Sequence, residues 1–376
     1  MIENRGLLVN KDSFNFIDLF SGCGGFSNGL ELAGHKCLLG VDIDKDAIES
    51  FKANHPHAQG HVMDIHKLTK PVLEKILDGQ IIDMVVGGPP CQGFSTVGRG
   101  DAEDTRNSLF KQFVRVVKIT QPKVVLFENV TGILAKKNEQ TLKAIFKSFE
   151  RLGYNMDARV MSADDYKVPS KRRRTIIMGV KGGLPQYPEK AKGSKVTVEQ
   201  VLNKLSKRKN VHNHEVDKAQ LANELDKKRL KHIPAGAGIR YERDELKYLP
   251  KKLRFDVNWK EISEGRFRQT KLQRLALDAP APTILTSRTM YYHPIECRYL
   301  TVREAALCQS FPMNFVFKGS QTAQFRQIGN AVPPLLAKHI GEEIKKIDFS
   351  KKQKVVFDRD KLAKSAFSYR EKRQYA

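Results

Sequence analysis

The sequence lacks long apolar runs, paired cysteines and an apolar leader region. Because no stretch is both apolar and long enough to span a bilayer, we expect a cytoplasmic chain without a membrane-spanning segment. The five cysteines form no C-x-x-C pair and no cluster with histidine at the spacing of zinc ligands. This cysteine pattern predicts a reducing compartment and no bound metal.

Acidic side chains are also scarce. The 376 residues include 42 Asp and Glu against 66 Lys and Arg, which gives a formal net charge of +24 and a pI near 9.7. Such a chain is suited to neutralising phosphate, so nucleic acid is the first partner to consider, although a Lys-rich proteome would explain the charge alone. At this length the chain can bury one large core and a smaller one, which predicts two domains.

The first third of the chain alternates apolar runs with helical patterns, as an α/β fold requires. Residues 14–20 predict a strand, and the glycine-rich turn at 21–26 leads into a helical pattern, an arrangement typical of nucleotide-binding folds. A second strand at 37–41 ends at Asp42, about twenty residues beyond the glycines, where a carboxylate can accept from ribose hydroxyls. A third run ends at Asp64. Together these strand ends favour an adenosine site.

A rigid turn carries the most informative cysteine. Residues 81–86 predict a buried strand, and the glycines and prolines of 87–95 then place Cys91 at its carboxyl end, where open α/β sheets bind ligands. The alternative is that Cys91 is a small buried hydrophobe. The strand predicted at 123–127 delivers Glu128 to the same edge, and a buried carboxylate is costly unless it is paired or used. We therefore expect Cys91 and Glu128 to face one cleft.

These motifs, in this order, resemble those of DNA (cytosine-5) methyltransferases of the bacterial restriction–modification type. The segments that carry the resemblance are residues 18–25, 89–92, 128–130, 172–174, 280–284, 300–306 and 327–333. The resemblance implies an α/β, Rossmann-like S-adenosylmethionine-dependent methyltransferase fold with a smaller, irregular target-recognition domain. It places the catalytic domain at 1–184 plus 320–376, and the recognition domain and hinge at 185–319.

The resemblance also implies the chemistry. A Cys91 thiolate would add to C6 of a cytosine flipped out of the duplex, which makes C5 able to attack a methyl group. A protonated Glu128 would donate to N3 of the ring, and Arg172 and Arg174 would hold the cytosine O2 and the acidic residue. The sequence names no base for removal of the C5 proton.

Two positions depart from the pattern of the family, and one charged residue has a structural expectation. Ser170 stands where the family usually has Gln, and Lys167 stands where it usually has Gly. Arg303 is expected to pair with a carboxylate and to organise the recognition domain.

The cofactor that the resemblance implies is S-adenosylmethionine. Phe20 would stack on the adenine, Asp42 would bind the ribose, and Asp64 would contact the adenine edge. The full set of expected cofactor residues is Phe20, Gly22, Cys23, Gly24, Gly25, Asp42, Ile43, Asp64, Ile65, Pro90, Leu109, Asn330 and Ala331.

Residues 181–278 are Lys-rich and lack the α/β rhythm, so they are expected to read the DNA target. Within them, 200–231 has a basic, helical pattern. Arginine and glutamine are the usual readers of bases in the major groove. The DNA-binding candidates are Ser95, Arg99, Arg243, Arg268 and Gln269. The expected partner is double-stranded DNA, bound by a nucleoid-associated monomer that a separately encoded restriction endonuclease would accompany.

Three alternatives remain open from the sequence. A tRNA cytosine-5 methyltransferase would share the core motifs, but the Cys-Phe-Thr insertion of that branch is absent. A catalytically silent DNA-binding homologue would not need Cys91, Glu128, Arg172 and Arg174. An NAD-linked oxidoreductase would explain the glycine turn and leave Cys91 without a role.

Overall fold

The computed structural model describes residues 13–89 and 107–350, which form two compact units. The first unit contains the described residues up to 162, residues 173–190 and the described residues from 334 onward. The second unit contains 163–172 and 191–333. It therefore includes 163–172 and 320–333, which the sequence pattern assigned to the catalytic domain.

The first unit is built on a large sheet. Within the described residues, seven strands pair in the order β3-β2-β1-β4-β5-β7-β6. Their bounds are β1 (Asn15–Leu19), β2 (Lys36–Asp42), β3 (Gln59–Val62), β4 (Met84–Gly87), β5 (Val124–Asn129), β6 (Tyr154–Ser162) and β7 (Arg173–Lys181). The first five strands pair in parallel, and β7 pairs antiparallel with both β5 and β6. The strand order reverses between β1 and β4, which is where ligands bind in sheets of this kind.

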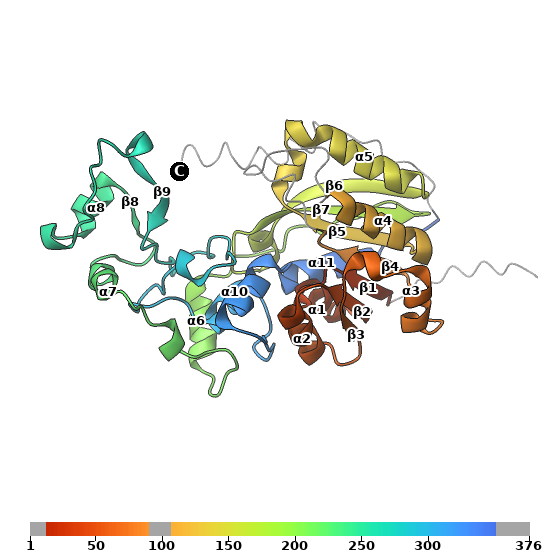
Figure 1. Cartoon of the computed structure of the whole chain (residues 1–376), viewed down its shortest axis with the longest axis horizontal. Helices are drawn as coiled ribbons and strands as arrows, with labels where there is room; N and C mark the ends of the chain where they lie inside the picture. The colour runs from red at the N-terminus through yellow and green to blue at the C-terminus, as the bar shows by residue number, and fades with distance from the viewer. Residues whose placement is uncertain (1–12, 90–106, 351–376) are drawn as a thin grey trace, which may run out of the picture. The chain divides into compact units, whose positions relative to one another are not determined.

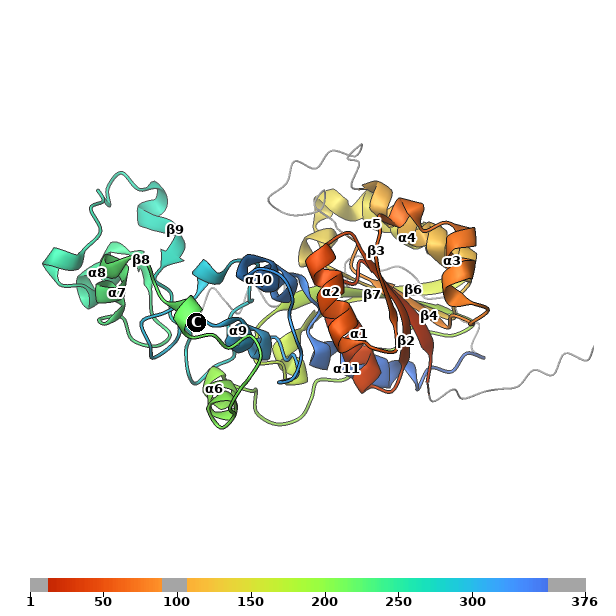
Figure 2. The ribbon, with the colours of Figure 1, turned by 60° about the horizontal axis from the view of Figure 1, so that its bottom comes forward.

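Helices cover both faces of this sheet. They are α1 (Gly25–Leu32), α2 (Lys45–Asn54), α3 (Lys70–Leu77), α4 (Asn107–Thr120), α5 (Glu139–Glu150) and α11 (Pro334–Ile344), with short 3-10 helices at η1 (Ile65–Lys67), η3 (Thr131–Leu134) and η4 (Lys136–Asn138). Helices α1, α2 and α11 lie along one face, and α3, α4 and α5 along the other (Figures 1 and 2). The core between sheet and helices includes a cluster of phenylalanine rings, with Phe127 at 5.5 Å from Phe113 and 5.7 Å from Phe149.

The helix that follows the last motif, α11, packs against the first helix of the fold. α11 packs directly on α1 because Gly29 has no side chain: a Cβ there would lie 2.2 Å from the carbonyl oxygen of Pro334. His35, just after α1, reaches the same helix, with Nε2 2.9 Å from the carbonyl oxygen of Gly341. Segments more than 300 residues apart in sequence therefore form one helical layer.

The second unit is less regular. Its elements are η5 (Ala163–Tyr166), α6 (Val198–Ser206), η6 (Asp217–Ala219), α7 (Glu224–Leu230), β8 (Ile239–Tyr241), α8 (Glu242–Tyr248), η7 (Lys251–Leu253), η8 (Ser263–Gly265), β9 (Arg266–Lys271), η9 (Arg288–Met290), α9 (Val302–Cys308) and α10 (Gln321–Asn330). The helical prediction for 200–231 is wrong over its middle. α6 ends at Ser206, and the chain after it has no continuous apolar face; Asn210 and Asn213 adopt left-handed φ angles of 53° and 61°, which a continuous helix does not allow. Helical structure resumes at α7.

Buried charges organise the second unit. Glu304 accepts from both terminal nitrogens of Arg298 at 2.8 Å, and both side chains are 3% exposed. Arg303, in contrast, does not pair with a carboxylate as predicted. Its fully buried guanidinium donates to the carbonyl oxygens of His212 at 3.0 Å, of Pro312 at 2.9 Å and of Phe315. Burial lowers the pKa of Arg303 to about 10. The reason for the difference is physical: three carbonyl dipoles replace the expected negative charge.

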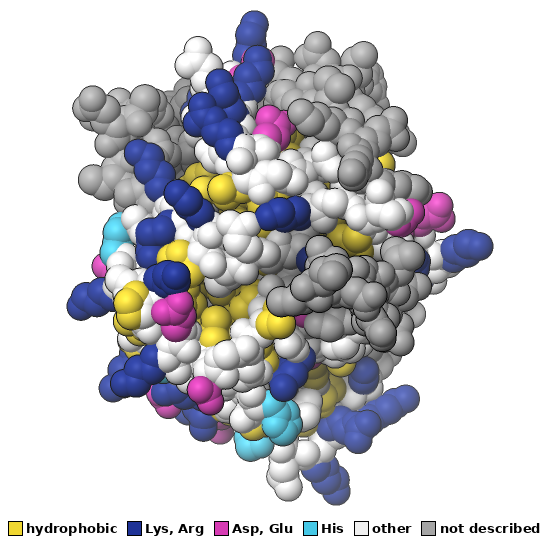
Figure 3. Space-filling model, turned by 90° about the vertical axis from the view of Figure 1, so that its right-hand side faces the viewer, with side chains coloured by type: hydrophobic (Ala, Val, Ile, Leu, Met, Phe, Trp, Pro, Cys, Tyr) yellow, Lys and Arg dark blue, Asp and Glu magenta, His cyan; other side chains and the backbone are white. Residues whose placement is uncertain are grey.

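No helix of the described residues has the length and apolar character needed to cross a membrane. The face shown in Figure 3 carries Lys and Arg side chains scattered among fewer acidic ones, in keeping with the net charge.

Candidate active site

The turn after β1 has an unusual backbone. Phe20, Gly22 and Gly24 have φ angles of 62°, 53° and 88°, all in the left-handed region. This conformation is ordinary for glycine but strained for Phe20, and such strain concentrates at functional sites. The amide of Gly24 donates to the carbonyl oxygen of Ser21 at 2.9 Å, and α1 then begins at Gly25. Backbone hydrogen bonding within the turn therefore contributes to its shape.

Asp42 lies beside this turn, because β2 pairs with β1. Its carboxylate accepts from the amide of Gly22 at 2.8 Å and from the amide of Asp44 at 2.9 Å. Burial raises the pKa of Asp42 above its ordinary value. Ile43 follows with 74% of its side chain exposed, which leaves an apolar surface next to the carboxylate. Asp42 therefore contacts the glycine turn directly, and the exposed Ile43 is the next residue in the chain.

Asp64 follows β3, the strand that pairs with β2. Asp64 caps the short helix η1 by accepting from the amide of His66 at 2.9 Å, and these contacts with His66 lower the pKa of its carboxyl. Ile65 is buried beneath it, and Leu109 of α4 packs against the same core. Cys23 is buried in the glycine turn, where burial raises the pKa of its thiol to about 12 and keeps it neutral.

Three expected cofactor residues are not part of the described first unit. Pro90 lies outside the described residues. Asn330 and Ala331 belong to the second unit, where they end α10.

The carboxylate of Glu128 faces the guanidinium of Arg174. Glu128 is in β5 and Arg174 in β7, which pair antiparallel, and the distance from Oε1 to Nε is 2.5 Å. The two side chains are 11% and 17% exposed. The Gly88 backbone lies alongside: a Cβ at Gly88 would be 3.8 Å from Oε2 of Glu128. Because β4 pairs in parallel with β5, the turn that leads to Cys91 begins next to this ion pair.

The other arginine of the motif has different partners. Arg172 belongs to the second unit, is 1% exposed and donates to the carbonyl oxygens of Gly329 at 2.7 Å and Asn330 at 3.2 Å. It therefore fixes the end of α10. Lys167, at a position where the family usually has glycine, has a φ of 62°, the conformation that glycine adopts most readily. Ser170 donates from Oγ to the carbonyl oxygen of Pro282 at 3.1 Å.

Three of the expected DNA contacts are described. Arg268 and Gln269 are exposed on β9, and Arg243 of α8 lies 4.8 Å from the ring of Tyr241. Cys91, Ser95 and Arg99 lie outside the described residues. No group of three or more residues that could hold a metal ion occurs in the part of the chain that the structure describes.

Sequence reasoning missed a buried polar cluster behind the glycine turn. Asp18 of β1 is fully buried and accepts from Oγ of Ser27 at 2.6 Å. Burial raises the pKa of Asp18 to about 7, against the opposing effects of Ser27 and His55. The signal that could have found it is a carboxylate in the middle of an apolar strand, which must have a partner.

Comparison with known proteins agrees with this geometry. A family model described as C-5 cytosine-specific DNA methylase matches residues 14–346. Type II methyltransferase M1.HphI of Haemophilus parahaemolyticus is 36% identical over 347 residues, which cover 91% of this chain and 89% of the relative. Type II methyltransferase M.DdeI of Desulfomicrobium norvegicum is 32% identical over 369 residues, with 88% of each chain covered.

A solved structure agrees as well. A protein described as a DNA modification methyltransferase, encoded within an E. coli prophage, has a TM-score of 0.69 at 26% identity and covers 89% of this chain and 99% of its own. The chain therefore belongs to the family of C-5 cytosine-specific DNA methylases and is a DNA (cytosine-5) methyltransferase with a Rossmann-like fold.

Proposed function

We propose that this chain methylates C5 of a cytosine that is extruded from duplex DNA, through a covalent bond between Cys91 and C6. The observation that carries the proposal is the Glu128–Arg174 ion pair beside the Gly88 backbone, where the cysteine-bearing turn begins. Glu128 meets N3 and the 4-amino group of the ring, and Arg174 holds Glu128 in place and reaches the cytosine O2. Arg172, in the second unit, fixes the end of α10.

The reaction is balanced by these groups. The thiolate of Cys91 forms a bond to C6, and electron density moves to C5, while a proton from Glu128 neutralises charge at N3. C5 then takes the methyl group as its bond to the donor sulfur breaks, which leaves a neutral thioether. The C5 proton leaves to water as the Cys91–C6 bond breaks, and N3 returns its proton to Glu128. Cytosine must leave the stack for this to happen, at a cost of roughly a few kcal/mol.

The methyl donor we propose is S-adenosylmethionine, which supplies an electrophilic methyl group when bound. The residues present fit its adenosine part. Asp42 offers a carboxylate for ribose hydroxyls, the exposed side chain of Ile43 offers an apolar surface for the base, and the strained Phe20 sits at the entry of the turn. Asp64 is placed to accept from the adenine amino group.

DNA recognition is assigned to the second unit. Arg243, Arg268 and Gln269 contact the duplex, and Ser95 and Arg99 contribute from the loop that follows Cys91. The names of the bacterial relatives support a role in a restriction–modification system, with a separately encoded endonuclease. We further propose that the chain acts as a monomer on nucleoid DNA.

A trapping experiment tests the reaction. Duplex DNA that carries 5-fluorocytosine retains fluorine where the C5 proton should leave, so the covalent bond cannot be released. With S-adenosylmethionine, we expect a denaturation-resistant adduct that disappears in Cys91→Ala and persists in the matched control Cys297→Ala. Absence of an adduct across a library of duplex sites contradicts the proposal, and an adduct formed on tRNA alone supports tRNA methylation instead.

A further inference from the structure

A buried histidine lies behind the glycine turn and takes no part in the proposed reaction. His55 follows α2 and is 1% exposed. Its Nδ1 is 2.7 Å from Oε2 of Glu31 on α1, and its Nε2 is 3.2 Å from the carbonyl oxygen of Gly24. The ring also packs on Phe51, with ring centroids 4.5 Å apart. The imidazole therefore joins two helices to the turn.

The contact between the ring and the turn is direct. A Cβ on Gly24 would lie 2.3 Å from Nε2 of His55 and 2.8 Å from the Phe51 ring, so only glycine permits this approach. The Gly24 carbonyl also accepts from the amide of Asn28 at 2.8 Å, which begins the hydrogen bonding of α1. The first turn of α1 and the ring of His55 therefore share the carbonyl oxygen of Gly24 as their hydrogen-bond partner.

Both ring nitrogens of His55 face oxygen atoms. Only a ring that carries a proton on each nitrogen donates to Glu31 and to Gly24 together. His55 also acts on the buried carboxyl of Asp18, where it opposes the rise in pKa that burial causes. Hydrogen bonds of this charge-assisted kind are the stronger ones.

We propose that His55 is a positioning residue that holds the cofactor turn in its binding shape through the Gly24 carbonyl, with Glu31 fixing the orientation of the ring. This inference rests on the proposed cofactor site. Without the His55 hydrogen bond, the strained backbone from Phe20 to Gly24 can adopt more conformations. Cofactor binding must then order the turn, which lowers the affinity. The effect appears in cofactor affinity and not in the rate of the chemistry once the site is filled.

The test is calorimetric titration of S-adenosylmethionine into the full chain. His55→Phe keeps the ring packing on Phe51 and removes both donors, and we expect about a 10-fold weaker cofactor affinity. His55→Gln restores one donor and recovers part of the loss, and Glu31→Gln weakens binding by roughly 3-fold. The methyl-transfer rate at saturating cofactor stays within about 2-fold. His57→Phe, at an exposed histidine two residues away, is the matched control.

Asp42→Ala separates the positioning role of His55 from the cofactor site itself. If Asp42→Ala weakens binding and His55→Phe does not, the positioning role of His55 is wrong while the cofactor site stands. If neither variant affects binding, the proposed cofactor site itself is wrong. A lower rate at saturating cofactor with unchanged affinity also overturns the positioning role. If His55→Phe does not fold, Glu31→Gln, which leaves the ring in place, decides by the same titration.

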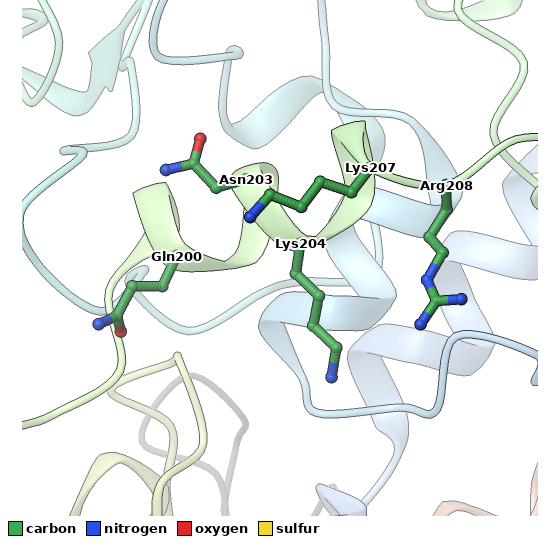
Figure 4. Close-up of a pocket in the computed structure, with 5 residues that line it drawn as sticks. All are labelled: Gln200, Asn203, Lys204, Lys207 and Arg208. Atoms are coloured by element: carbon green, nitrogen blue, oxygen red, sulfur yellow. The ribbon is translucent and has the colours of Figure 1, made fainter.

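Helix α6 of the second unit borders a basic pocket. This helix buries Val198, Val201 and Leu205. Exposed side chains of the helix and of the two residues after it line a surface pocket of about 430 Å³. Figure 4 shows the five side chains that line the pocket: Gln200, Asn203, Lys204, Lys207 and Arg208.

The three cations of this pocket are exposed. None of them forms an ion pair with a carboxylate of the described chain. Cations near the carboxyl end of α6 interact favourably with the helix dipole, and this effect alone would explain the presence of one or two lysines. A rim of three cations and two side-chain amides also matches the oxygens of a phosphodiester. We infer that this pocket binds a backbone phosphate of the DNA substrate, without reading sequence.

The salt dependence of DNA binding tests this inference. Each DNA phosphate that a cation neutralises adds about 0.9 to the slope of log affinity against log salt. We therefore expect Lys204→Ala with Arg208→Ala to lower that slope by about 1 to 2 and to weaken target and non-target duplexes equally. The control is Lys143→Ala with Lys147→Ala, two exposed lysines of α5. An unchanged slope, a weakening confined to target DNA, or a weakening confined to RNA overturns the inference.

Discussion

Glu128 and Arg174 meet across β5 and β7 with 2.5 Å between Oε1 and Nε, and the Gly88 backbone lies beside them. The pairing follows from antiparallel register, since Glu128 stands opposite Ile176 and Arg174 lies two residues before it. Shielding from water strengthens the Coulomb attraction between guanidinium and carboxylate, and it makes the loss of one partner costly for the other.

Removal of this guanidinium should therefore lower the activity of the enzyme more than the stability of its fold. Arg174→Ala takes away the positive charge that faces Glu128, and we expect methyl transfer to fall at least about 100-fold. Arg174→Lys keeps the charge but not the planar fork, and should lose less. The measurement is incorporation of labelled methyl into DNA. Arg159→Ala, at an arginine of β6 that is 55% exposed, should retain near-normal activity, and equal losses in both variants would contradict the role.

The buried carboxyl of Asp18 predicts a pH dependence of stability. Its pKa is about 7 in the folded chain against an ordinary 3.8, so folding takes up a proton between about pH 4 and 7. The free energy of unfolding should then decrease as the pH rises through this window. Asp18→Asn removes the titration, so wild type should lose about 4 kcal/mol relative to the variant between about pH 4 and 8. Urea unfolding of both proteins across the window measures this difference, and parallel curves would contradict it.

The buried ion pair of the second unit offers a matched comparison on one arginine. Glu304 and Glu296 both bind Arg298, but Glu304 is 3% exposed and Glu296 53% exposed. Glu304→Gln should destabilise the chain by about 3 kcal/mol, because a buried guanidinium loses its counter-charge. Glu296→Gln should cost less than about 1 kcal/mol. Thermal unfolding separates the two cases, and equal shifts would show that burial is not the deciding factor.

The left-handed backbone at Lys167 predicts that glycine is more stable than alanine at this position. At φ 62° an L-residue is strained, while Lys167 also donates from Nζ to the carbonyl oxygen of Ser194 at 2.7 Å. Lys167→Ala and Lys167→Gly both lose that hydrogen bond, so their difference reports the backbone alone. The glycine variant should be more stable by about 1 kcal/mol. A more stable alanine variant in urea unfolding would indicate that the turn relaxes.

Patterns that depend on neighbours in sequence were predictable. The continuous apolar runs of parallel strands located β1 to β5, and the alternation of strands and helices gave the fold class. The ends of the strands were less certain, since β5 extends to Asn129 and includes Glu128, where an end at residue 127 was expected.

Partners that are distant in sequence were not predictable. Nothing in the sequence around Arg303 says that its guanidinium meets carbonyls of residues 212, 312 and 315, because a loop brings them there. For the same reason Arg172 and Arg174, two residues apart, were expected to act as one functional pair and have unrelated partners. The helical prediction failed for the charged segment after α6. In a segment of mostly polar residues the sequence gives no sign of where an apolar helix face ends.

The contact between α1 and α11 also sets an order of events during synthesis. Gly29 is covered by Pro334 and Ala337, so the β1–α1 segment cannot complete its packing until the chain beyond residue 334 is made. Since domains form as units while the chain emerges, the whole recognition segment must be translated first. A truncated nascent chain thus lacks a finished catalytic unit, and methylation begins only in a molecule that already carries its means of choosing a site.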